Sequence, residues 1–221
     1  MKLSELREQQ KREAELRSLQ AHIRPHFLYN TLDTIHWMAR KKGADDVSDL
    51  VESLSRLFRI GLSKGDDIIP MPDEWMHISS YLQIQKTRYR DRLQVEMYVS
   101  PEAEKLYVLK LLLQPMVENA IYHGIKARRG PGRIGIKAEV SEDVLFLSIQ
   151  DDGAGMAPER LAELRKQLAD PVAAMEGHSE QGTGRSRSYG MLNVQARLRL
   201  TFGHKYGITL ESTEGVGTRV I

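Results

Sequence analysis

The amide side chain of Asn119 lies in the segment VENAIYHG (residues 117–124), among apolar residues that favour a helix. A polar amide inside such a helix needs a hydrogen-bond partner or a ligand, because an unpaired buried polar group costs free energy. Taken alone, the segment is explained most simply by a structural hydrogen bond. His123 and Gly124 follow about one turn later, so the segment is a candidate binding site if other motifs support it.

A carboxylate, Asp151, ends a predicted strand in QDDGAGM (residues 150–156), and Gly153 and Gly155 follow it. An Asp-x-Gly-x-Gly pattern after a strand is most often only a turn. A third segment, SYGMLNV (residues 188–194), follows a polar, glycine-bearing stretch and is predicted to open a helix with Gly190. Free N–H groups at a helix N-terminus can bind phosphate, although a plain capped start is commoner.

The first third of the chain is predicted to be helical. Residues 3–40 contain no glycine and carry apolar residues at spacings of three and four, which is typical of a long amphipathic helix. A stop at residues 42–46 separates it from a second amphipathic helix over residues 47–62. A helical hairpin cannot bury both apolar faces alone, so we expect two copies to pair as a homodimer with a four-helix bundle.

The remaining two thirds mix helices and strands without strict alternation. Helices are predicted over residues 72–90, 107–123, 158–168 and 190–202, and strands over residues 94–99, 134–140, 144–150, 208–211 and 218–221. This order favours an α+β fold, built as an α/β sandwich, over a doubly wound parallel sheet. We therefore expect two domains, residues 1–91 and residues 92–221, and the second carries all three motifs.

Charge and composition argue against several classes of partner and site. A total of 32 Lys and Arg residues against 30 Asp and Glu residues gives a net charge of +2, so there is no electrostatic reason to expect nucleic acid as a partner. The absence of cysteine excludes disulfides and thiolate metal sites, and the histidines show no tight pair that would predict a zinc site. No apolar run approaches the roughly 18 residues of a membrane span, so we expect a soluble fragment of a longer protein.

Together and in this order, the three segments resemble the ATP-binding domain of the GHKL superfamily, the Bergerat fold of histidine kinases, Hsp90-type chaperones, gyrase-type topoisomerases and MutL-type proteins. The resemblance implies that Asn119 binds Mg²⁺, that Asp151 accepts a hydrogen bond from the adenine amino group, and that Thr218 supports the adenine end. Gly153 and Gly155 would let the backbone approach the base. The implied ATP-binding residues are Asn119, His123, Asp151, Gly153, Gly155, Met156, Gly190, Met191 and Thr218.

The whole chain resembles the LytS/YesM type of sensor histidine kinase. The segments RPHFLYNTL (residues 24–32), YLQIQKTRYRDRL (81–93) and LLLQPMVENAIYHG (111–124) carry this resemblance. It implies that His26 accepts a phosphoryl group from ATP and passes it to an aspartate of a response regulator. Pro25 gives no N–H to the preceding turn, so a bend there would help to present His26; otherwise His26 is only a polar residue on the seam of the bundle.

The resemblance also implies a cellular context. The chain would be the cytoplasmic portion of a bacterial inner-membrane sensor protein, with a membrane sensor domain upstream. Residues 156–190 would form an ATP lid, in which Arg185 and Arg187 either bind phosphate or are simply solvated charges. The family usually has Asn at the position of Arg24 and Gly at that of Ser188, and a side chain at Ser188 could restrict closure of the lid. The alternative function is a non-catalytic dimeric scaffold that uses ATP as a conformational switch.

One position predicts slow ATP hydrolysis. In the hydrolytic members of the superfamily, a glutamate four residues before the magnesium asparagine activates the attacking water. Here that position is Pro115, which has no proton-accepting side chain. Glu118, next to Asn119, would point about 100° around the helix. We therefore expect a protein that is competent toward histidine and poor as an ATPase.

Overall fold

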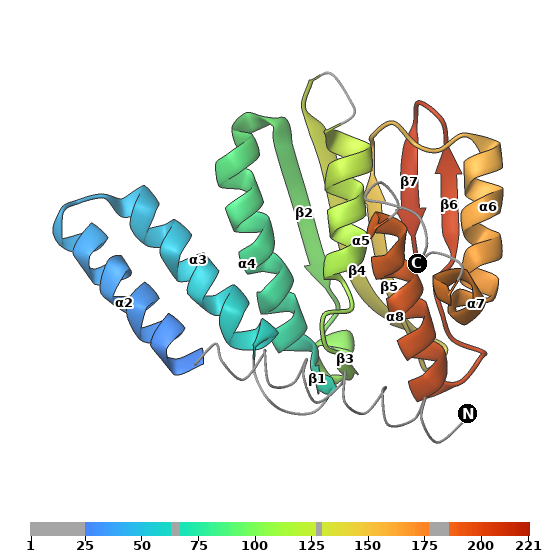
Figure 1. Cartoon of the computed structure of the whole chain (residues 1–221), viewed down its shortest axis with the longest axis horizontal. Coiled ribbons are helices and arrows are strands. Elements are labelled where there is room, and N and C mark those ends of the chain that lie inside the picture. Colours follow the sequence, from blue (N-terminus) through green and yellow to red (C-terminus); the bar gives the residue numbers. More distant parts are fainter. Residues whose placement is uncertain (1–24, 63–66, 127–129, 177–185) are drawn as a thin grey trace, which may run out of the picture. The chain divides into compact units, whose positions relative to one another are not determined.

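The structure is a computed structural model, and it describes residues 25–62, 67–126, 130–176 and 186–221 (Figure 1). The chain forms two compact units, Met1–Lys64 and Gly65–Ile221. Each unit is treated by itself below. No helix within the described ranges has the length and apolar character that crossing a membrane requires.

The first unit is a hairpin of two helices, α2 (Pro25–Lys41) and α3 (Asp45–Gly61). The turn between them contains Gly43 with a φ of 68°, a conformation that costs glycine little. Asp45 and Asp46 lie in the first turn of α3, where negative charge is favourable. The predicted second helix is confirmed. Of the predicted first helix, the part before residue 25, including the surroundings needed for a bend at Pro25, lies outside the described residues.

Polar contacts fix the two helices of the hairpin to each other. The hydroxyl of Tyr29 donates to the carbonyl of Phe58 at 3.3 Å, and the guanidinium of Arg59 lies 5.7 Å from the centre of the Tyr29 ring. Farther along, His36 Nδ1 and the Ser48 hydroxyl are 2.9 Å apart. The opposite side of α2 remains exposed and carries large apolar side chains, including Phe27 and Trp37, which are 72% and 70% exposed.

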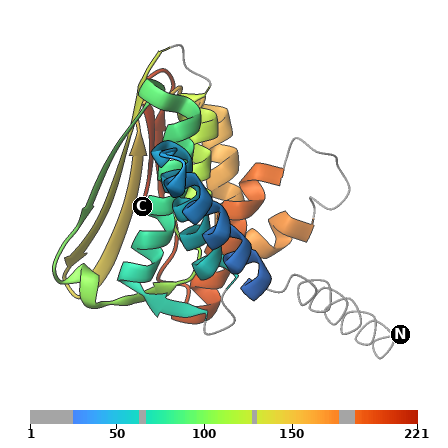
Figure 2. The same ribbon diagram turned by 90° about the vertical axis from the view of Figure 1, so that its left-hand side faces the viewer.

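The second unit is a sheet covered on one face by helices (Figure 2). Its five strands are β2 (Leu93–Val99), β4 (Gly132–Ser141), β5 (Val144–Asp151), β6 (Leu210–Thr213) and β7 (Gly217–Val220). The strand order is β2-β4-β5-β7-β6, with β2 and β4 parallel and the other neighbours antiparallel. Ile134, Ile136 and Ala138 are fully buried and alternate with exposed or half-buried neighbours, as expected for a strand with one covered face.

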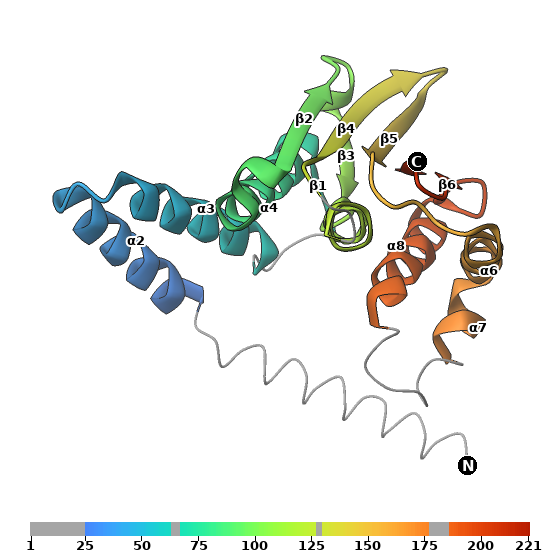
Figure 3. The same ribbon diagram turned by 90° about the horizontal axis from the view of Figure 1, so that it is seen from above.

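The covering layer consists of α4 (Met71–Tyr89), α5 (Gln114–Asn119), α6 (Pro158–Ala169), α7 (Pro171–Glu176) and α8 (Ser186–Phe202). α5 lies between α4 and α8 (Figure 1), and α6 and α8 lie on the same side of the sheet when it is seen from above (Figure 3). The remaining short elements are a two-stranded ribbon of β1 (Ile68–Pro70) and β3 (Tyr107–Leu109) and the 3₁₀ turns η1 (Arg90–Arg92) and η2 (Ala103–Lys105). The predicted α+β sandwich is confirmed.

The helix expected over residues 107–123 starts later than predicted. Its first residues form β3, and Leu111 has a φ of 57°, which is incompatible with a continuing helix. The fully buried carboxylate of Glu74, on α4, accepts hydrogen bonds from the N–H groups of Leu111 and Leu113 at 2.9 and 2.8 Å. This contact stabilises the irregular turn, so the helix begins at Gln114.

The helix of Asn119 continues as a π-helix, η3 (Ala120–Ile125). In it the hydrogen bonds connect residues five apart, as between the N–H of Lys126 and the carbonyl of Ile121 at 2.9 Å. Such π-helical turns occur frequently at functional sites. The apolar pattern of residues 107–123 predicts an ordinary α-helix here, so the π-helical turn is a difference from the prediction.

Two further boundaries differ from the predictions. The helix expected to open at Gly190 begins at Ser186, and the short helix α7 lies before it, where no helix was predicted. α4 falls within the predicted first domain, but it belongs to the second compact unit, because it packs against β2 and the β1–β3 ribbon. The predicted boundary between the two functional domains, after residue 91, stays a prediction.

Candidate functional site

A pocket of about 350 Å³ opens in the second unit between the α5–η3 helix, strands β5 and β7, and helices α6 and α8. This volume is within the range of small-ligand sites. The pocket is lined by Met116, Asn119, Ala120, His123, Gly124, Ile149, Asp151, Ala154, Gly155, Met156, Ala157, Arg160, Leu164, Met191, Leu210, Thr218 and Val220. Segments from Met116 to Val220, far apart along the chain, therefore meet around one space.

Asp151 supplies a buried carboxylate at one wall of this pocket. It is the last residue of β5 and is 6% exposed, and its Oδ1 accepts a hydrogen bond from the N–H of Gly153 at 2.9 Å. Burial raises the pKa of the carboxyl from 3.8 to about 6, while hydrogen bonds from the backbone of Gly153 and Thr218 act in the opposite direction. At neutral pH the group is mainly an ionised acceptor with little water around it.

Glycines make room around this carboxylate. A Cβ atom on Gly124 would lie 2.5 Å from Asp151 Oδ1, and one on Gly153 would lie 2.1 Å from the Cα of Gly124. Gly155 has a φ of 64°, and a Cβ there would lie 1.9 Å from the carbonyl oxygen of Thr213. The loop after β5 is thus pressed between η3 and the β6–β7 turn, and no larger residue fits. Gly153 itself does not line the pocket, so it acts through packing.

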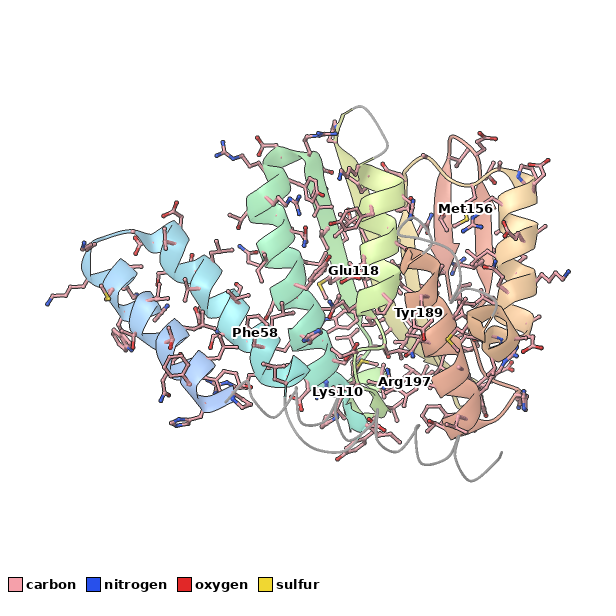
Figure 4. All side chains as sticks on the ribbon, viewed as in Figure 1. Phe58, Lys110, Glu118, Met156, Tyr189 and Arg197 are labelled. Atoms are coloured by element: carbon pink, nitrogen blue, oxygen red, sulfur yellow. The ribbon has the colours of Figure 1, made fainter. Side chains whose placement is uncertain are left out.

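Asn119 is the last residue of α5 and lines the pocket. Its Nδ2 atom is buried and has no hydrogen-bond partner among the described residues, so the amide retains unused hydrogen-bonding capacity beside the pocket. The structural hydrogen bond that would explain Asn119 most simply is therefore lacking for Nδ2. Glu118, labelled in Figure 4, instead accepts a hydrogen bond from Gln114 Nε2 at 2.8 Å and does not line the pocket.

A hydroxyl pair, Ser212 and Thr218, lies on the β6–β7 side of the pocket, where Thr218 is the strand neighbour of Asp151. Ser212 Oγ accepts a hydrogen bond from the N–H of Met156 at 2.9 Å and lies 2.9 Å from Thr218 Oγ1. Ser212 also donates to the carbonyl of Gly217 at 3.0 Å. Through these bonds the residue holds Met156 (Figure 4) and Thr218 at fixed positions on the pocket wall. Nothing in the local sequence around Ser212 indicated this role.

Most of the predicted ATP-binding residues come together in the pocket, and two do not. The residues that line it are Asn119, His123, Asp151, Gly155, Met156, Met191 and Thr218. Gly190 lies within the second turn of α8 rather than at its start, and a Cβ there would lie 3.0 Å from the Cβ of Pro115. Its small size permits close packing of α8 on α5, so the predicted helix start at Gly190 is wrong, and a role of Gly190 in ATP binding stays a prediction.

Other lining residues were not predicted. Arg160 and Leu164 come from α6 and face the pocket together because they are one helical turn apart. This spacing was visible in the sequence, but nothing there indicated which helix would cover the loop after β5. Of the expected lid, residues 177–185, with Arg185, lie outside the described residues, and of Arg187 and Ser188 only the backbone is described.

His26 is on the exposed side of α2 in the first unit. Its Nδ1 lies 3.2 Å from Nδ2 of Asn30, one turn farther along the helix. By contrast, His36 contacts Ser48, and Nε2 of the buried His77 lies 2.7 Å from Oε1 of Gln114. Those two histidines hold helices together, whereas the His26 ring is accessible.

Comparisons with known proteins match both units. Residues 14–93 match the family model described as "Histidine kinase", and residues 108–221 match the one described as "Histidine kinase-, DNA gyrase B-, and HSP90-like ATPase". The chain is 33% identical over 210 residues to the sensor histidine kinase YesM of Bacillus subtilis (strain 168), which is 95% of this chain and 33% of that protein.

Two further relatives are similar over nearly the whole chain. Sensor histidine kinase BtsS of Escherichia coli (strain K12) is 33% identical over 208 residues, covering 94% of this chain and 33% of that protein. Sensor protein LytS of Bacillus anthracis is 28% identical over 218 residues, covering 98% of this chain and 35% of that protein. The chain thus spans about a third of the length of these curated relatives.

Proposed function

Because this chain belongs to the histidine kinase-, DNA gyrase B-, and HSP90-like ATPase family, as a sensor histidine kinase of the LytS/YesM type, we propose that it transfers the γ-phosphoryl group of ATP to His26 and from there to an aspartate of a response regulator. The observation that carries the proposal is the buried Asp151 carboxylate in a pocket kept open by glycines. Such a carboxylate accepts hydrogen bonds strongly, because little water competes for it.

The adenine base would occupy the inner end of the pocket. Its amino group donates to Asp151, and Thr218, held by Ser212, lies on the neighbouring strand β7 and supports the same edge. Apolar side chains of Met116, Met191 and other lining residues bury the faces of the base. This arrangement combines one specific polar contact with apolar walls, as is usual for small-molecule sites.

The side chain of Asn119 would hold Mg²⁺. The donor set fits, since Asn119 lines the pocket and its amide oxygen is a hard ligand; its buried Nδ2, which has no partner among the described residues, can donate to a phosphate oxygen. Mg²⁺ commonly takes only one or two protein ligands in addition to substrate phosphates and water. When bound, the ion neutralises charge on the phosphates during transfer.

In the transfer step, the unprotonated nitrogen of the neutral His26 imidazole attacks the γ-phosphorus of ATP. An N–P bond forms while the bond between this phosphorus and the β–γ bridging oxygen breaks, which releases ADP. The phosphoryl group later moves to the aspartate of the response regulator and frees the imidazole. Pro115 offers no base at the position that would activate water, so histidine rather than water is the favoured nucleophile.

We also propose that the hairpin works as a homodimer. Phe27, Trp37 and Met38 are exposed by 72%, 70% and 58% on α2, and burial of such side chains against a second copy is favourable. A response regulator would dock near His26. A membrane sensor upstream of these residues is part of the same proposal, based on the resemblance to the LytS/YesM kinases.

The test is incubation of the purified chain with γ-labelled ATP and Mg²⁺. We expect acid-labile, base-stable label on the protein, which His26→Gln abolishes while nucleotide binding is unchanged. His204→Gln, a matched change at another exposed histidine, should label normally. Intact ATP binding without label in the dimeric wild type would favour the non-catalytic scaffold, and a His26→Gln variant that still labels would refute the acceptor assignment.

A further inference from the structure

We infer that Asn30 is a positioning residue that selects the nitrogen of His26 at which phosphorylation occurs; this inference rests on the proposed function. Asn30 Nδ2 and His26 Nδ1 lie 3.2 Å apart on α2, at a spacing of four residues. Both side chains are exposed. The contact therefore holds one nitrogen of the ring and leaves the other, Nε2, open to an incoming phosphate.

A neutral imidazole carries its proton on one nitrogen and a lone pair on the other, and the hydrogen bond made by one nitrogen decides which. If Asn30 donates through Nδ2, Nδ1 accepts, so Nε2 carries the proton and cannot attack. If the carboxamide is turned over, Oδ1 accepts the proton of Nδ1. Nε2 then holds the lone pair and can attack phosphorus.

The Asn30 side chain can supply either end of its carboxamide. The two ends are nearly identical in shape, and the side chain has no second hydrogen-bond partner in the described part of the chain. The backbone around it is fixed, since Thr34 Oγ1 donates to the Asn30 carbonyl at 2.7 Å and Tyr29 ties the same turn to α3. Rotation of the amide therefore changes which nitrogen of the His26 ring carries the proton, without moving the helix.

The turned-over amide can also keep its hydrogen bond to His26 after the ring is phosphorylated. After attack through Nε2, the new N–P bond is on Nε2 and the proton remains on Nδ1. This proton can still be donated to Asn30 Oδ1. The same hydrogen bond thus favours the attacking form of His26 and remains in the phosphorylated form, so we expect the phosphoryl group on Nε2.

Three variants separate this role from a structural one. Asn30→Asp keeps only acceptor atoms and should fix the proton on Nδ1, so it should label at least as fast as the wild type. Asn30→Ala removes the hydrogen bond and should slow labelling by roughly 2- to 10-fold, the equivalent of one ordinary hydrogen bond. Thr31→Ala, at the next exposed position, is the control and should label normally. Alanine is a better helix former than asparagine, so lost folding would not explain a slower Asn30→Ala.

The deciding measurement is the nitrogen NMR spectrum of histidine-labelled protein at about pH 8, where an ordinary imidazole is neutral. The His26 signals are assigned with His26→Gln. We expect the Nδ1–H form to dominate in Asn30→Asp, to decrease in Asn30→Ala, and the phosphorylated wild type to carry phosphorus on Nε2. Identical His26 spectra in all variants, or phosphorus on Nδ1, would overturn the inference. If the wild type takes no label, the proposed function fails, and the spectra of the variants still decide the role of Asn30.

Discussion

Replacement of Asp151 by asparagine should separate nucleotide binding from stability. The substitution preserves the shape of the side chain and removes its charge. An ionised acceptor is worth about 1.5–3 kcal/mol in a hydrogen bond, and the amide can also present its NH₂ group to the adenine amine. The dissociation constant for ATP should therefore rise by roughly 10- to 150-fold.

The stability of the nucleotide-free protein should rise or stay the same in this variant. Burial raises the pKa of Asp151 from 3.8 to about 6, so this carboxyl contributes stability when protonated, below pH about 4, and that contribution is lost as the pH rises through about 6. At pH 7 the ionised form thus costs about 3 kcal/mol relative to a neutral group. An amide avoids this cost, so the Tm without nucleotide should stay the same or rise by up to roughly 10 °C.

Isothermal titration with ATP and thermal unfolding of the nucleotide-free protein measure the two quantities. Asp152→Asn is the matched control, because this neighbouring carboxylate is exposed, does not line the pocket and accepts a hydrogen bond from the N–H of Arg133. It should bind ATP like the wild type. An unchanged dissociation constant in Asp151→Asn would place the adenine site elsewhere, and a sharply lowered Tm would mean that the carboxylate is a structural group.

Four further outcomes are expected. ATP affinity of the wild type, measured by titration over pH 5–8, should fall as Asp151 protonates below pH about 6, by at most about tenfold per pH unit; a flat profile contradicts an ionised acceptor. Asn119→Ala should weaken binding of Mg²⁺–ATP much more than binding of metal-free ATP, and equal losses in both titrations would count against a ligand role. Gly124→Ala should weaken ATP binding roughly tenfold or more, since its Cβ would lie 2.5 Å from Asp151 Oδ1 and overpacking costs about 1–3 kcal/mol; Gly135→Ala, where a Cβ meets nothing within 4 Å, is the control that should bind normally. Steady-state phosphate release should be slow, and fast hydrolysis that persists in His26→Gln would show that water, not histidine, is the natural nucleophile.

The site residues that could be predicted are those whose chemical role can be recognised from a short segment of sequence. Asp151 ends a strand and is followed by glycines, and Asn119 interrupts an apolar helix, so each is conspicuous in its own sequence neighbourhood. Arg160 and Ser212 contribute only because α6 and β6 fold against the loop after β5. Their place in the pocket is a property of tertiary packing, which a local pattern does not contain.

The same reason explains the errors in element boundaries. The start of α5 depends on Glu74, whose carboxylate binds backbone groups 37 and 39 residues away. Apolar periodicity across residues 107–123 gave no sign of that contact. Gly190 resembles a helix start in sequence, yet its neighbour in space is Pro115, so its small size serves helix packing.

The π-helical turn η3 has a consequence for the length of the chain at this point. With bonds between residues five apart, Asn119 and Gly124 both reach the pocket, although an α-helix would turn the second away by about 140°. Removal of a single residue between them would leave a spacing of four, which an α-helix turns through about 400°, so the two positions would still face the same side. The spacing and the winding of this segment are therefore coupled: five residues wound as a π-helix and four wound as an α-helix both bring the two positions to one side, whereas five wound as an α-helix do not.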